Sequence, residues 1–461
     1  PGKLEEISRE ARRADANVIV TDDELSARQE RNLEAAVRSG NPFYGWVVEG
    51  LELYRALGRS CPGSRHPDAT EVATVAASLA ARHQCGAYRV TGVLAHAGRR
   101  SSVEGVSDDL RQRLCGRALE LVDIPSESRS EATLAAHVLG LLEAGGLDVR
   151  DGGDDCVLAG VLEKRERPLV LLAGHLDTVP SQGNIPGRLT ADGVEGLGAA
   201  DMKGSLAVMI ELALAGTGGA CDVGYLFFGR EELPPEHSSL VPLLDREPGL
   251  RSADLVLMME PTANQVQAGC LGNLNATWHF RGRSGHSARP WLAENAIAAL
   301  AEGVAELEAR EPVEHRFEGL SFHEVFSVTS IDGGIARNVI PGEASAHVNY
   351  RYPPGVSPQE AEERLSEACG DHGELEIEAN APSGEVVASG PLVDDLVALS
   401  GGPVEPKQAW TPVAEFGAAG VRAVNFGPGE PAQAHRSDEA IGAEALATSF
   451  EAITRLAEGG S

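Results

Sequence analysis

Lysine is nearly absent from this chain of 461 residues, which contains only Lys3, Lys164, Lys203 and Lys407. Aspartate and glutamate outnumber lysine and arginine by 69 to 39, so the formal net charge is −30. A surface this acidic repels phosphate backbones and anionic lipid headgroups, which argues against nucleic acid and membranes as partners. It suits high salt, where screening weakens repulsion between like charges, and we therefore favour a halophilic source.

Long apolar runs and paired cysteines are also missing. No stretch approaches the roughly 20 apolar residues of a membrane span, and the chain does not start with the charged and then apolar segments of a signal peptide. The seven cysteines are scattered, odd in number and without a C-x-x-C pair, which is typical of a reduced protein. We therefore expect a cytoplasmic protein, and its length allows two or three domains.

The acidic charge is confined to one part of the chain. Residues 1–105 carry 14 acidic and 14 basic side chains, so the whole excess lies in residues 106–461. Residues 98–105 are small, polar and flanked by glycine, as in a linker. We therefore predict an N-terminal module over 1–105, of unknown function. Residues 21–34 faintly resemble the N-terminal region of HflX-type GTPases, but no phosphate-binding loop follows and no GTPase activity is inferred.

The most informative segment of the acidic part places a histidine and an aspartate two residues apart. His175 and Asp177 follow the apolar run 169–173, which has the length and composition of a buried strand. Ligands bind beyond the carboxyl ends of such strands in open α/β sheets. Strand alternation puts both side chains on one side, where the imidazole can hold a metal and the carboxylate can orient it.

Further acidic and imidazole side chains end apolar runs or lie in glycine-rich loops: Asp201, Glu231, Glu232, Glu260 and His435. With His175, this gives two imidazoles and three carboxylates for two zinc-like ions, one carboxylate bridging them. Glu231 is then left over as a base for the attacking water. Any one of these acids alone is better explained as a helix cap or a solvated loop residue. Their ordered occurrence favours a metal centre.

This ordered set resembles the M20 family of dinuclear zinc aminohydrolases and peptidases, and within it the succinyl-diaminopimelate desuccinylases. The resemblance covers about residues 106–461. It implies a layered α/β catalytic domain, like that of zinc peptidases, with an inserted α+β lid that also forms a homodimer. We assign 106–266 and 381–461 to the catalytic domain and 267–380 to the lid. Further blocks that carry the resemblance are 267–272, 285–289, 294–297, 333–341 and 349–352.

The resemblance also implies a role for each site residue. The cofactors are two Zn²⁺ ions, for which Co²⁺ is a possible substitute. His175 and Glu260 would bind one ion, Glu232 and His435 would bind the other, Asp201 would bridge them, Asp177 would support His175, and Glu231 would be the general acid and base. His286 of the lid would stabilise the oxyanion in the partner subunit's site, and Arg351 and Asn338 would bind substrate carboxylates. From the residues alone, His286 could instead be a turn histidine and Arg351 could pair with a structural acid.

The sequence departs from the desuccinylase pattern near the C-terminus. Pro412 and Glu415 stand where the desuccinylases have an aspartate and an arginine. A carboxylate at position 415 would repel an anionic end of the substrate. Either another arginine compensates, such as Arg289 or Arg422, or the substrate differs.

Three functions remain open. The first is hydrolysis of an N-acyl amino acid, with N-succinyl-LL-2,6-diaminopimelate of lysine biosynthesis favoured over N-acetylornithine or a dipeptide. The second is a catalytically silent relative that binds amino-acid derivatives, although a binding module has no need of the base Glu231. The third is an interaction or regulatory protein, acting through residues 1–105, with an enzyme attached.

Overall fold

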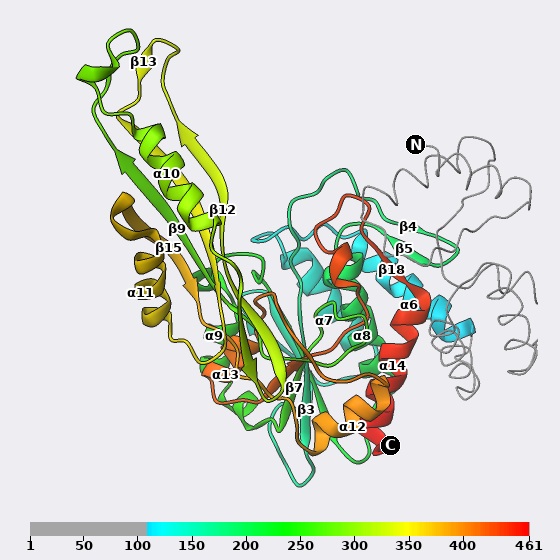
Figure 1. The fold of residues 1–461 in the computed structure, drawn as a ribbon. Helices are drawn as coiled ribbons and strands as arrows, with labels where there is room; N and C mark the ends of the chain where they lie inside the picture. The colour runs from blue at the N-terminus through cyan, green and yellow to red at the C-terminus, as the bar shows by residue number, and fades with distance from the viewer. Residues whose placement is uncertain (1–107, 461) are drawn as a thin grey trace, which may run out of the picture. The chain divides into compact units, whose positions relative to one another are not determined.

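The computed structural model describes residues 108–460, which fall in the second of the two units into which the chain divides, 106–461. The predictions made for residues 1–105 lie outside the described residues. Figure 1 shows that the described part consists of an α/β body and an elongated lid. No helix in this part is long and apolar enough to cross a bilayer.

The body is built on an eight-stranded mixed sheet in the order β1-β2-β6-β3-β7-β17-β8-β16. Its four central strands run parallel, and all seven residues of β3 are buried, as expected of a strand covered on both faces. These central strands are β6 (Asp222–Phe228), β3 (Leu169–His175), β7 (Leu255–Met258) and β17 (Ala423–Asn425). The flanking strands are β1 (Val149–Gly153), β2 (Cys156–Gly160), β8 (Gln267–Ala268) and β16 (Glu405–Pro406). The strands predicted near 168–174, 223–228 and 254–259 are therefore present.

Helices cover both faces of this sheet (Figure 1). One group comprises α6 (Asp108–Val122), α7 (Ala132–Ala144), α8 (Gly204–Ala215), α12 (Pro391–Ser400) and α14 (Ala443–Glu458). The short helices α9 (Leu240–Arg246) and α13 (Val413–Ala418) lie on the other side. A small sheet of β4 (Arg188–Leu189), β5 (Gly193–Glu195) and β18 (Ala440–Gly442) ties the C-terminal segment to the loop before α8. The five described cysteines are buried and free.

The lid is a five-stranded antiparallel sheet in the order β11-β12-β14-β9-β15. Buried and partly buried residues alternate along β9 and β14, and the buried ones pack against two helices in a separate core. The strands are β9 (Gly272–Arg281), β11 (Val313–Phe317), β12 (Leu320–Gly333), β14 (Glu343–Tyr352) and β15 (Glu374–Ala381), and the helices are α10 (Ala296–Glu308) and α11 (Pro358–Cys369). A separate two-stranded antiparallel sheet of β10 (Gly285–His286) and β13 (Val339–Ile340) lies at the far end (Figure 1).

The start of the lid differs from the prediction in one detail. The predicted boundary at 267 places Gln267–Ala268 in the insert, whereas β8 pairs with β17 and β16 in the central sheet. The first lid strand begins at Gly272. The apolar pattern runs on from one sheet into the other, and for this reason the sequence does not mark the transition.

Candidate metal centre

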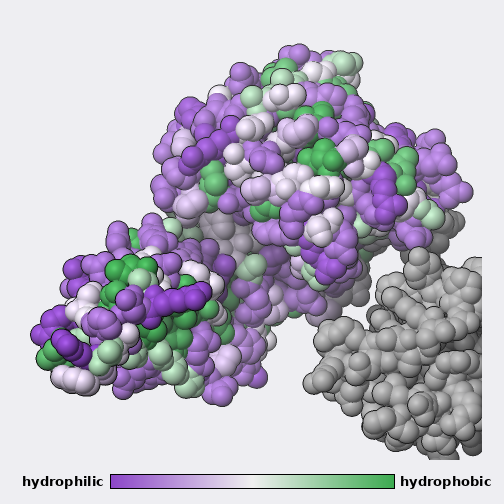
Figure 2. Space-filling view, turned by 90° about the horizontal axis from the view of Figure 1, so that it is seen from above, coloured by the Kyte–Doolittle hydropathy of each residue, from purple (hydrophilic) through white to green (hydrophobic). Residues whose placement is uncertain are grey.

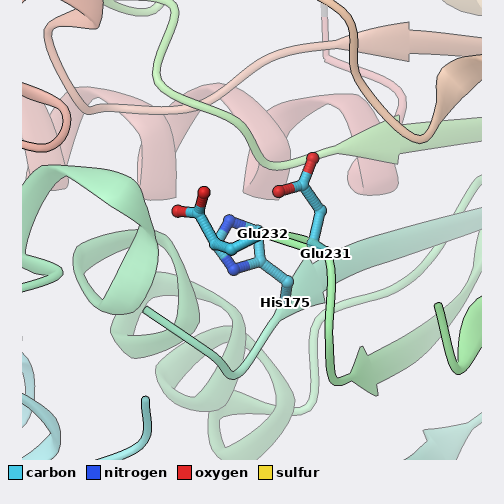
Figure 3. Close-up of side chains that lie close together, drawn as sticks. All are labelled: His175, Glu231 and Glu232. Atoms are coloured by element: carbon cyan, nitrogen blue, oxygen red, sulfur yellow. The ribbon is translucent and has the colours of Figure 1, made fainter. Parts of the chain in front are cut away.

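The imidazole and carboxylate side chains predicted for the metal centre meet at the carboxyl ends of the central strands. His175 ends β3, Glu231 and Glu232 follow β6, and Glu260 follows β7. Figure 3 shows the two glutamates on one loop with His175 beside them. The loop after β17 contributes His435. This convergence follows from parallel strands, whose carboxyl ends share one edge of the sheet.

One group of potential ligands comprises His175, Asp201 and Glu260, whose donor atoms lie within 4.8 Å of one another. His175 Nε2 lies 3.2 Å from Asp201 Oδ1 and 3.9 Å from Glu260 Oε1. His175 and Glu260 are buried. Burial and the neighbouring charge of Asp201 raise the pKa of Glu260 to about 7, because crowded carboxylates disfavour one another's ionised forms.

A second group comprises Asp201, Glu232 and His435. His435 Nε2 lies 2.9 Å from Glu232 Oε1 and 3.7 Å from Asp201 Oδ2. The hydrogen bond to Glu232 raises the pKa of His435 to about 9. Asp201 therefore stands between the groups, with Oδ1 toward His175 and Oδ2 toward His435.

These side chains fit a pair of cations. Burial, together with the charges of Glu260 and Glu232, raises the pKa of Glu231 well above its usual value. Glu260 Oε1 is buried without a hydrogen-bond partner. A buried carboxylate oxygen without a donor is costly, and a cation at this point would relieve both the desolvation and the mutual repulsion. The two imidazoles and three carboxylates are donors that zinc accepts.

Asp177 contacts more than the imidazole it was predicted to support. His175 Nδ1 lies 3.0 Å from the backbone carbonyl of Asp177 and 3.6 Å from its carboxylate. That carboxylate accepts hydrogen bonds from the backbone N–H groups of Glu231 and Glu232, at 3.0 and 3.1 Å, and from the Ser128 hydroxyl. Asp177 thus fixes the loop that carries both glutamates as well as the histidine.

The same loop is held by two residues that we did not single out from the sequence. The buried Glu131 accepts a hydrogen bond from the N–H of Arg230, and Ser239 Oγ bonds to both the N–H and the carbonyl of Gly229. Arg230 has a φ of 63°, a left-handed conformation that is uncommon outside glycine. These bonds compensate the strained turn that presents Glu231.

Glu439 is a further buried residue missing from the sequence predictions. Its carboxylate accepts hydrogen bonds of 2.8–2.9 Å from the backbone N–H groups of Gly198, Ala200 and Asp201. These residues belong to the π-helical turn Ala199–Lys203 and its N-cap, ahead of α8. Glu439 follows His435 by four residues, so one side chain ties the loop of His435 to the loop of Asp201.

The three predicted lid residues lie at opposite ends of the lid. His286 and Asn338 are exposed at the distal end, where the N–H of Ser287 donates to the Asn338 carbonyl. Arg351 lies near the body, opposite Asn273 at the start of β9. Roughly 26 Å of β14 separates Glu343, near the distal end, from Arg351. One chain therefore cannot bring all three residues to one small substrate.

Arg351 has the environment of an anion-binding residue. Its guanidinium is largely buried, and burial lowers its pKa. Its Nε donates to Asn349 Oδ1 at 2.9 Å, and Asn349 Nδ2 in turn donates to Asn273 and Asn275. No carboxylate among residues 108–460 forms an ion pair with Arg351. The alternative that Arg351 pairs with a structural acid is therefore not supported in this part of the chain.

Glu415 differs from the expectation of a carboxylate facing the substrate. It is only 6% exposed, and its Oε2 accepts a hydrogen bond from Ser238 Oγ at 3.2 Å, while Oε1 has no partner. Burial raises the pKa of Glu415 to about 7. Neither proposed substitute arginine compensates at this point, because Arg422 donates to the Ser389 carbonyl and Arg289 lies in the lid, ahead of the short helix Pro290–Leu292.

We expect Glu415→Gln to stabilise the protein at alkaline pH. Since burial raises the pKa from 4.5 to about 7, the folded state binds a proton that the unfolded state lacks between these values, and stability falls as pH rises. The difference corresponds to about 3 kcal/mol. Denaturant unfolding should show the variant more stable by about that amount at pH 8 and equal to the wild type near pH 4.

The exposed Glu385 provides the matched control for this prediction. Glu385→Gln should show no such pH-dependent difference from the wild type. If Glu415→Gln unfolds like the wild type at both pH values, the carboxyl is ionised at no cost and our description of its burial is wrong.

Family models and known proteins match large parts of this chain. A family model described as a peptidase dimerisation domain matches residues 270–375, and one described as the N-terminal part of GTP-binding GTPases matches residues 1–39. A putative succinyl-diaminopimelate desuccinylase of Mycobacterium tuberculosis is 36% identical over 355 residues, covering 76% of this chain and 99% of the relative. The succinyl-diaminopimelate desuccinylase of Corynebacterium glutamicum is 34% identical, over 69% of this chain and 89% of its own length. An N-acetyl-L-citrulline deacetylase of Xanthomonas campestris is 31% identical, with coverages of 68% and 87%.

Solved structures share the fold. A tripeptidase of Staphylococcus aureus superimposes with a TM-score of 0.62 at 18% identity, over 76% of this chain and 98% of its own. An M20 family metallo-carboxypeptidase of Sulfolobus solfataricus gives 0.61 at 16% identity, with coverages of 77% and 99%. The sequence identities to the full-length relatives go further than the fold. This chain belongs to the M20 family of hydrolases.

Proposed function

We propose that this protein hydrolyses the amide bond of an N-acyl amino acid with the help of two zinc ions. The single observation that carries the proposal is the position of Asp201, whose two oxygens face two separate groups of ligands. His175 and Glu260 would hold one ion, Glu232 and His435 the other, and Asp201 both. Glu231 remains outside this set, on a loop fixed by Asp177.

Different residues of this chain would carry out the separate steps of hydrolysis. Bound zinc ions supply Lewis acidity toward the amide carbonyl and the attacking water. Glu231 accepts the proton of that water and delivers it to the leaving nitrogen. Arg351 binds a carboxylate of the substrate, to which a guanidinium offers two parallel donors.

The substrate we favour is N-succinyl-LL-2,6-diaminopimelate, cleaved to succinate and LL-2,6-diaminopimelate. Two of the relatives above carry the name of this activity. Deacetylation of an N-acetyl amino acid is the second candidate, because a relative named as an N-acetyl-L-citrulline deacetylase is 31% identical and Pro412 and Glu415 depart from the desuccinylase pattern.

We propose that the active form is a homodimer assembled through the lid, residues 267–380 in our assignment. The match to a peptidase dimerisation domain supports this. Since His286 and Asn338 lie far along the lid from Arg351, they would complete the partner subunit's site. Figure 2 shows hydrophobic residues gathered on the lid, and its exposed apolar side chains are Trp291, Leu292, Ile297, Val313, Ile331, Ile335 and Ile377.

Metal analysis joined to a small substrate panel tests the proposal. We expect two zinc ions per chain, loss of activity with a chelator, and recovery with zinc or cobalt. N-succinyl and N-acetyl derivatives of diaminopimelate, ornithine and citrulline, with one dipeptide, would identify the substrate. A fully active protein with one ion per chain would contradict the dinuclear arrangement. Two bound ions without cleavage of any of these amides would favour a silent binding relative.

A further inference from the structure

Lys407 is an unpaired ammonium group beside the metal centre. It is one of the four lysines of the chain and is only 6% exposed. Its Nζ donates to the carbonyl of Pro261 at 3.2 Å, one residue beyond Glu260. Among residues 108–460, no carboxylate oxygen lies within 4.0 Å of Lys407 Nζ, the limit for an ion pair.

A buried ammonium with one acceptor is an incomplete arrangement. The group has three donors and no acceptor, and burying a charge is costly unless it is paired. The exposed Lys164, by contrast, pairs with Asp254 at 2.7 Å. The buried Lys407 therefore retains donors for an anion that the described residues do not supply.

The backbone of Lys407 pairs with the segment that leads to the strand opposite Arg351. The backbone N–H of Lys407 bonds to the Ala268 carbonyl, on the segment that continues through Cys270 into β9 and to Asn273, opposite Arg351. Burial and Asp201 raise the pKa of Glu260 to about 7, and the positive charges of His175 and Lys407 act in the opposite direction. Lys407 is thus close enough to the ligands to act on their charge, and no ion pair joins it to a carboxylate of residues 108–460.

The neighbouring residues hold Lys407 where the body meets the lid. Gln408 accepts a hydrogen bond from the N–H of His323 and donates to the carbonyl of Ser321, both on β12. Lys407 itself follows directly after β16, whose Glu405 pairs with Gln267 of β8. The segment that carries Lys407 is thereby joined to the central sheet through β16 and to the lid through Gln408.

We propose that Lys407 binds the free carboxylate of a dicarboxylic acyl group, such as succinyl, while Arg351 binds a carboxylate of the amino acid. This inference rests on the proposed amide hydrolysis and names the acyl class that the site prefers. In a succinyl group the terminal carboxylate lies three carbon–carbon bonds, about 4 Å, from the scissile carbonyl. Lys407 Nζ contacts Pro261, the residue after Glu260, and a cation at this position suits the short distance between the two ends of a succinyl group. Lys407 would also supply a positive charge in place of the arginine that the desuccinylases have at the position of Glu415.

The experiment compares the wild type, Lys407→Met, Lys407→Arg and Lys164→Met on two substrates that differ only in the acyl group. The N-succinyl and N-acetyl derivatives of diaminopimelate serve as the pair. We expect Lys407→Met to lower the ratio of kcat/KM, succinyl over acetyl, by roughly 10- to 100-fold, the effect of one charge-assisted hydrogen bond. Lys407→Arg should recover part of the ratio, and Lys164→Met should keep it.

Calorimetric titration with succinate and with acetate adds a readout independent of turnover. Lys407→Met should weaken the binding of succinate by a similar factor and keep its zinc content. An equal loss on both substrates with an unchanged affinity for succinate would overturn the inference, because Lys407 would then only offset the charge of the ligands. A wild type that cleaves the acetyl but not the succinyl substrate would overturn it as well. A wild type that cleaves neither would be tested on the other amides of the panel, and failure on all of them would refute the proposed function, while succinate titration would still decide whether Lys407 binds dicarboxylates.

Discussion

Replacing Glu231 with glutamine should lower turnover by roughly 10²–10⁴, the range for a positioned acid or base, while the protein keeps its metal content. Glutamine has nearly the same size but cannot accept the proton of the attacking water. The hydrogen bond from the Glu231 N–H to Asp177 involves the backbone and survives the change. Steady-state kinetics, metal analysis and a thermal melt on the same sample would measure all three quantities.

Glu236→Gln is the matched control, because Glu236 is an exposed glutamate five residues further on the same segment. It should leave turnover and metal content unchanged. Near-normal turnover in Glu231→Gln would make Glu231 a structural acid and would remove the proton transfer from our mechanism. Loss of metal together with turnover would instead make Glu231 a ligand, which its grouping with His175 and Glu232 allows.

The second large effect concerns His286 at the distal end of the lid. His286→Ala should lower turnover by about 10²–10³, the usual loss for one oxyanion donor, without loss of zinc or of the fold. Its side chain is exposed, and among residues 108–460 its hydrogen bond is with the N–H of Ala288, at 3.1 Å, so its removal disturbs no core. The loss would therefore arise in a neighbouring subunit's site.

Mixing His286→Ala with Glu231→Gln tests that neighbour directly. A hybrid dimer contains one site with an intact Glu231 and an intact His286 from the partner subunit, so part of the activity should return. Size-exclusion chromatography with differently tagged subunits would demonstrate that hybrids form. If they form without recovering activity, His286 serves its own subunit or takes no part in catalysis.

The sequence was sufficient for the elements that carry the ligands. The run before His175 is apolar at every position, which only a strand buried on both faces requires, and β3 is such a strand. The resemblance to the M20 family implied that Asp201, Glu260 and His435 would meet, since Asp201 and His435 lie in segments that no strand pattern places.

Features set by three-dimensional proximity were not predictable in this way. Glu131 and Glu439 act on backbone N–H groups roughly 100 and 240 residues away, and neither belongs to a recognisable spacing. The burial of Glu415 and the isolation of Lys407 depend equally on what packs around them. The separation of Asn338 from Arg351 required the register of β14. The periodicity of apolar residues can be read from a single sequence, whereas the contact partners of a buried side chain cannot.

The position of β17 in the central sheet bears on how the protein is made. β17 is the last of the central strands in the chain, yet it lies between β7 and β8, which are translated before the whole lid. A nascent chain that has left the ribosome only as far as the lid therefore has an incomplete sheet and lacks His435. The lid has a core of its own, whereas the second group of ligands is complete only near the end of translation. Proteolysis or a premature stop within this last segment would leave a chain whose ligand set lacks His435.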